Sequence, residues 1–209
     1  MTSVRARASV DSGGWVEVPA LADARERERW AAAVVDAVAR AHGERFDPEL
    51  APALRKLVVG IAADREESDL LRLAFLPTPG LIASTVRVAI VESQPAELWR
   101  EAGYALSPIR TERMGEGMLA SRTTESREDG QRLVGHECMF VFTSEDLGIA
   151  VRVPPIDPVL FDRMQAGLTD IVRSLVVEFD DGRAFTGEPV AGLPGGPADT
   201  WHIGTHDAS

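Results

Sequence analysis

Apolar residues recur at helical spacing in two segments of the first third of the chain. Over residues 21–41 an apolar side chain returns every third or fourth position, which places these side chains on one helix face. Asp47 then precedes Pro48, an order typical of a helix start because the aspartate caps free amides and the proline needs no amide partner. We therefore expect a helical hairpin against a sheet. The two apolar faces comprise Trp30, Ala33, Val34, Ala37, Val38 and Ala41, and then Leu50, Leu54, Leu57, Val58 and Ile61.

Alternating apolar and polar residues, typical of strands with one buried face, dominate the middle of the chain. Asp129-Gly130 is a favoured hairpin turn, and Thr78-Pro79-Gly80 suits a type II turn because proline fixes φ and glycine accepts a positive φ. Connections this short require antiparallel neighbours. We expect strands over 15–18, 70–76, 81–91, 114–124, 131–143 and 147–153, with a short helix over 95–102 and a loop through Tyr104 and Pro108.

The last third of the chain predicts one long helix. Pro154-Pro155 is expected to end the sheet, and Asp157-Pro158 repeats the signal of a capped helix start. The fold class is therefore α+β, with one mostly antiparallel sheet of five or six strands, a helical hairpin before it and this helix packed across it. The apolar face of the helix comprises Phe161, Met164, Leu168, Ile171, Val172 and Leu175. The expected organisation is an N-terminal arm (1–13), a single α+β domain (14–178) and an acidic, Gly/Pro-rich C-terminal tail (179–209).

The layout of residues 114–177, a strand meander closed by a helix, resembles that of the Mog1/PsbP-like group of small α/β/α domains. The resemblance implies a sheet layered with helices. That group includes binding and assembly factors, so the resemblance implies no catalytic residues in this chain.

Charge narrows the expected partners. The net charge is −11, which disfavours nucleic acid and anionic membrane surfaces because like charges repel. Lys56 is the only lysine among many arginines and alanines, a composition that indicates a GC-rich bacterial genome. A single cysteine forms no intramolecular disulfide, and no apolar run approaches the roughly 20 residues of a membrane span or follows a signal-peptide pattern. We therefore expect a cytoplasmic protein.

One set of residues has the chemistry of a metal site. His136 and Cys138 lie two apart on a predicted strand and so on one face, and His202 and His206 lie four apart in the tail. Three histidines and a thiolate suit tetrahedral zinc. The same strand face carries Val134, Phe140 and Phe142, which indicates a core face where cysteine and histidine pack. We predict no metal and no cofactor, and keep the four residues as the candidates.

Catalytic motifs are absent from the sequence. It contains no G-x-S-x-G elbow and no phosphate-binding loop with its lysine. His42-Gly43-Glu44 matches half of the zinc deaminase pattern, but the required pair of cysteines is missing. His42 suits the C-terminus of the first helix, where a partly charged imidazole complements the helix dipole. These observations favour a protein that is not an enzyme.

Three hypotheses for the function follow. The first is a non-enzymatic interaction protein, such as an adaptor, assembly component or accessory factor, that binds another protein or a second copy of itself. The alternatives are an acidic immunity or chaperone-type protein for a basic partner, and a small-ligand binder or enzyme with a pocket between hairpin and sheet. The candidate pocket residues are His136, Cys138, Arg87 and Tyr104, and the candidate partner-binding residues are Asp180, Asp181, Glu188 and Trp201.

Overall fold

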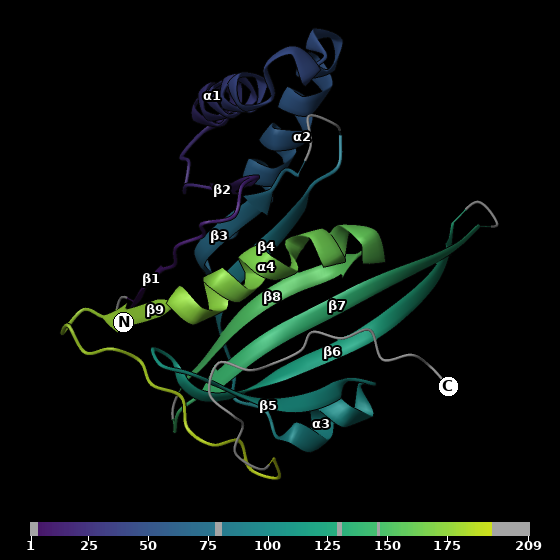
Figure 1. Cartoon of the computed structure of the whole chain (residues 1–209). Coiled ribbons are helices and arrows are strands. Elements are labelled where there is room, and N and C mark those ends of the chain that lie inside the picture. Colours follow the sequence, from purple (N-terminus) through teal and green to yellow (C-terminus); the bar gives the residue numbers. More distant parts are fainter. Residues whose placement is uncertain (1–3, 78–80, 129–130, 146, 194–209) are drawn as a thin grey trace.

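The computed structural model describes residues 4–77, 81–128, 131–145 and 147–193 (Figure 1). These residues form a seven-stranded antiparallel sheet, a two-stranded sheet and four α-helices. The elements are β1 (Val4–Arg7), β2 (Trp15–Glu17), α1 (Ala24–His42), α2 (Ala51–Ala63), β3 (Asp69–Phe75), β4 (Ser84–Val91), α3 (Ala96–Glu101), β5 (Ala105–Thr111), β6 (Gly115–Glu128), β7 (Gln131–Thr143), β8 (Gly148–Ile156), α4 (Pro158–Ser174) and β9 (Val176–Phe179). The α+β class predicted from the sequence is confirmed.

The large sheet has the order β2-β3-β4-β8-β7-β6-β5, and β1 pairs with β9 in the small one. β5 to β8 form a meander, as the short connections predict. Its last strand, β8, pairs with β4, so β5, which follows β4 in the chain, lies at the far edge of the sheet. β6 and β7 are longer than their neighbours and project beyond the sheet as a two-stranded ribbon (Figure 1).

β5 accounts for the difference between the predicted five or six strands and the seven observed in the large sheet, and prolines are involved in two departures from the prediction. Residues 105–111 form β5 and not a loop, and Pro108 is tolerated because β5 is an edge strand. Pro154 and Pro155 do not end the sheet, because β8 continues to Ile156. The register with β7 jumps between His136 and Cys138, so the two prolines sit at an irregularity where a missing amide donor is not needed.

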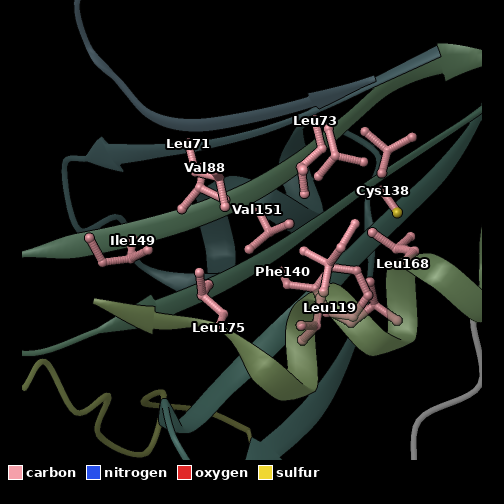
Figure 2. Close-up of a cluster of buried hydrophobic side chains, with 14 of the residues drawn as sticks. Leu71, Leu73, Val88, Leu119, Cys138, Phe140, Ile149, Val151, Leu168 and Leu175 are labelled. Carbon is pink, nitrogen blue, oxygen red and sulfur yellow. The ribbon is translucent and has the colours of Figure 1, made fainter. Parts of the chain in front are cut away.

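The main core lies between the sheet and α4 (Figures 1 and 2). Every second residue of the central strands points to this side and packs against the apolar face of α4, as the periodicity predicts. Asp157 starts α4 by accepting hydrogen bonds from the amides of Val159 (2.9 Å) and Leu160 (3.3 Å). The buried side chains of this core include Leu73, Val88, Leu119, Phe140, Val151, Met164, Leu168 and Ile171.

Among the described residues, helices cover the opposite face of the sheet at its two ends. The α1–α2 hairpin packs on Ala74 and Leu76 of the β3 segment, and α3 packs Trp99 over Met118 and Met139. The structure is therefore layered, with helices on both faces of the sheet. Between the two covers, the central strands carry charged side chains.

The segments that flank the domain pack against it. β1 pairs with β9, and Val4, Ala6 and Ala8 contact the main core. After β9 the chain returns along the sheet, where Phe185 is buried. The described parts of the expected arm (1–13) and tail (179–209) thus contribute side chains to the core.

Two helical glycines should respond in opposite ways to alanine. A Cβ at Gly167 of α4 would collide with the indole nitrogen of Trp15, whose ring lies tilted against that of Phe75, whereas a Cβ at Gly60 of α2 meets nothing within 4 Å. Gly167→Ala is expected to lower the free energy of unfolding by about 1–3 kcal/mol through overpacking. Gly60→Ala should raise it by about 0.5–1 kcal/mol, because alanine is the better helix former. Urea unfolding measures both, and equal signs would contradict the packing of Trp15 on α4.

Candidate functional site

An apolar groove of about 390 Å³ lies between α1 and the edge strand β2. β2 contributes Trp15 and Val16 to its lining, and α1 contributes an apolar stripe. All six residues of the predicted apolar face, from Trp30 to Ala41, line this groove. His42 lines it as well and is the last residue of α1, in the last turn where the sequence predicted it.

The groove exists because α2 covers a different face of α1. The buried contacts with Leu54 and Val58 of α2 come from Ala31, Val34 and Val35. Of the stripe from Trp30 to Ala41, Val34 is buried in this cluster, and Trp30 and Val38 are partly buried against it. Of the remaining stripe, Ala33, Ala37 and Ala41 are exposed.

β2 presents a strand edge to the groove. The Val18 amide donates to the Arg72 carbonyl (2.9 Å), and the Gly14 carbonyl accepts from the Leu76 amide (2.6 Å). In an antiparallel pair successive residues point their backbone groups to opposite sides. The amides and carbonyls of Trp15 and Glu17 therefore point away from β3, and among the described residues no strand pairs with this side of β2.

A cluster of polar side chains lies at the centre of the sheet face opposite α4, between the α1–α2 hairpin and α3. The fully buried carboxylate of Asp69 accepts hydrogen bonds from the Glu66 amide (3.1 Å) and from Arg87 Nε (2.8 Å). Its other near cation is Arg72, whose Nη1 lies 3.7 Å away. Burial lowers the pKa of the Arg72 guanidinium, and the charge of Asp69 opposes that change.

A similar arrangement surrounds Glu137 at the far end of this face. Its buried carboxylate accepts from Arg122 Nε (2.8 Å) and from Arg152 Nη2 (3.3 Å). The Arg122 guanidinium lies 4.3 Å from the centre of the Tyr104 ring and donates to the Ala102 carbonyl after α3. Burial, followed by the charge of Glu137, raises the pKa of the Tyr104 phenol.

The four candidate pocket residues divide between the two faces of the sheet. Arg87 and Tyr104 lie on the open face, each beside one of the buried carboxylates. His136 and Cys138 lie on the α4 side, where the Cys138 thiol is buried in the main core (Figure 2) and burial raises its pKa far above the usual range. These four residues therefore do not line one common pocket.

The metal candidates have ordinary packing partners. His136 is half-buried, its Nδ1 lies 3.3 Å from Thr123 Oγ1, and its ring lies 5.8 Å from that of Phe161. Val134 is 37% exposed on the projecting ribbon, so the prediction that it shares the core face is wrong, because neither α4 nor β8 reaches that far along β7. In the described ranges no three His, Cys, Asp or Glu residues gather as metal ligands. His202 and His206 lie outside the described residues.

One arginine, Arg183, lies among the candidate partner-binding residues. Asp180 and Asp181 follow β9, and Asp181 pairs with Arg183 at 3.7 Å. Glu188 is exposed, and its amide donates to the Thr143 carbonyl. Trp201 lies outside the described residues. The described part of this stretch thus contains several acids and one base, Arg183.

Sequence reasoning missed Arg72, Arg152, Asp69 and Glu137 as a group. A signal was present, since Arg72 and Arg152 each interrupt an apolar strand run, as Arg87 does. A charged residue between two core positions points to the opposite face, but the pairing of distant strands decides which of these charges meet.

The sequence matches no protein-family model, no curated protein and no solved structure. The resemblance of residues 114–177 to the Mog1/PsbP-like layout therefore stays a prediction.

Among the described helices, none combines the length and the apolar character that a membrane crossing requires.

Proposed function

We propose that this chain is a non-enzymatic interaction protein whose α1–β2 groove binds an extended apolar segment of a partner protein. The observation that carries this proposal is the groove itself, an apolar helix face and an edge of β2 with which no described strand pairs, which together bound one space of about 390 Å³. This combination matches strand addition, in which backbone hydrogen bonds supply affinity and pockets for alternate side chains supply specificity.

The two walls of the groove suit the two sides of an extended segment. Its backbone would pair with the outward amides and carbonyls of Trp15 and Glu17, which a helix could not satisfy because its own backbone groups are already bonded. Every second side chain would point to α1, where Ala33 and Ala37 leave room for larger apolar groups. Trp30 supplies a large apolar surface beside them.

The test is a selection of random peptides against the full chain, with affinities measured by tryptophan fluorescence because Trp30 lines the groove. Selected peptides are expected to show alternating apolar residues. Ala37→Glu should weaken their binding at least tenfold, because a carboxylate in the occupied groove loses its water. Ala53→Glu is the matched control, since Ala53 is exposed on α2 and does not line the groove.

Backbone modification separates strand addition from other modes of binding. Methylation of alternate peptide nitrogens should abolish binding in one register and leave it nearly unchanged in the other, since only every second amide faces β2. Equal binding by the Ala37→Glu protein, or indifference to methylation in both registers, would refute the proposal.

A further inference from the structure

A row of three arginines crosses the centre of the sheet on the face opposite α4. Arg72 of β3 is the cross-strand partner of Arg87 in β4, and Arg87 is the partner of Arg152 in β8. Like charges directly opposite one another on neighbouring strands repel. Strands lie about 4.8 Å apart, so three guanidinium groups share roughly 10 Å of one surface. The row therefore needs anions close by.

The row retains hydrogen-bond donors at both ends. Nε and Nη1 of Arg72 are buried without a hydrogen-bond partner, and the side chain is 6% exposed. Its Asp69 neighbour, at 3.7 Å from Nη1, is beyond hydrogen-bond distance. At the other end Arg152 is 52% exposed, and its described contact is one 3.3 Å bond from Nη2 to Glu137. The internal carboxylates thus leave part of the row's donor capacity unused.

Glu66 occupies the middle of the row from the short connection between α2 and β3. Its carboxylate lies 2.8 Å from Arg87 Nη2 and accepts a 3.3 Å hydrogen bond from Ser68 Oγ. The Glu66 side chain is 60% exposed, whereas Asp69, the other acid on Arg87, is fully buried. Glu66 can therefore leave Arg87 at little cost, and Asp69 cannot.

We propose that Arg72, Arg87 and Arg152 bind the phosphate or carboxylate group of a small molecule, and that Glu66 is an internal competitor which this ligand displaces. The oxygens of the ligand replace the Glu66 carboxylate on Arg87 and accept hydrogen bonds from Arg152. Guanidinium groups suit this role because their planar donors match carboxylate and phosphate oxygens. The site is separate from the α1–β2 groove, and neither proposal depends on the other.

The test follows the NMR signals of the arginine Nε–Hε groups in the full chain. Pyrophosphate, inorganic phosphate, citrate and succinate are the probes, and sodium chloride at matched ionic strength controls for screening. Saturable shifts at Arg87 and Arg152 are expected. Saturation by the phosphates alone assigns a phosphorylated ligand, and saturation by the carboxylates alone assigns a carboxylate. Shifts that follow ionic strength alike for every salt, or no saturation by any probe, would overturn the proposal.

Two pairs of variants test the roles of the residues. Glu66→Gln should tighten binding about two- to fivefold, because the competitor is lost. Glu67→Gln removes the same charge from the same loop and should have little effect. Arg152→Gln should weaken binding about tenfold or more, whereas Arg132→Gln, on the projecting ribbon, should not. A Glu66→Gln protein that binds more weakly than the unsubstituted chain would show that Glu66 supports the site and does not compete.

Discussion

Asp69→Asn is expected to lower the free energy of unfolding by about 3–5 kcal/mol. The substitution keeps the shape of the side chain and one carbonyl acceptor for the Glu66 amide, but it removes the charge between Arg72 and Arg87. Arg72, whose side chain is 6% exposed, would then be a buried cation without its ion-pair partner Asp69. Urea unfolding with the linear extrapolation measures the loss.

Arg72→Met isolates the reason for that loss. Methionine fills much of the same space without charge, so the double variant should lose less stability than the sum of the two single variants. Glu137→Gln is the matched comparison, because its arginines, Arg122 and Arg152, are partly exposed and can turn to water. It should cost clearly less than Asp69→Asn. If the losses of stability of the two single variants add up in the double variant, or if Asp69→Asn and Glu137→Gln cost the same, then an unpaired buried Arg72 does not explain the loss.

Local signals predicted the elements of this fold well where one physical effect dominates. Asp157-Pro158 starts α4, and its apolar face packs across the sheet as expected. The strand over 131–143 has the predicted bounds because alternation and the flanking turns agree. The errors at Pro108 and Pro154-Pro155 have one cause. Proline removes a hydrogen-bond donor, and whether a strand needs that donor depends on its neighbours, which the local sequence does not reveal.

The candidate sites were harder to predict because they depend on what lies next to each element. The apolar stripe from Trp30 to Ala41 was recognised, but its spacing equally suits a face that packs on α2 and a face that lines a groove. The arginine row depends on β8 inserting beside β4, because only that pairing places Arg152 opposite Arg87. A one-residue change of register would instead send Arg152 into the main core.

The two proposed sites occupy different parts of the molecule and would read different chemistry. The α1–β2 groove is apolar and ends at an edge strand, and the arginine row is polar and lies between the hairpin and α3. β3 links them, because it pairs with β2 on one side and carries Arg72. The Val18 amide donates to the carbonyl of Arg72 itself, so the edge strand and the row share one hydrogen-bonded unit.

Phe140→Ala is expected to lower the free energy of unfolding by about 3–5 kcal/mol and the melting temperature by roughly 6–20 °C. Phe140 of β7 is fully buried and points into the core beneath α4 (Figure 2). Its removal leaves a cavity that the surrounding β-strands cannot close, because their positions are fixed by pairing on both sides. Calorimetry and urea unfolding measure the two quantities.

Leu133→Ala on the same strand is the control for Phe140→Ala. Leu133 is 43% exposed on the projecting ribbon, so its truncation should change stability by less than about 0.5 kcal/mol. Both residues are apolar and on β7, but an odd number of positions separates them, so Leu133 points to the opposite face from Phe140, and it also lies beyond the pairing with β8. Similar losses at the two positions would mean that the ribbon contributes as much to stability as the layer beneath α4. A large loss at Phe140 alone would confirm that the layer between α4 and the sheet contributes more to the stability of the fold than the projecting ribbon does.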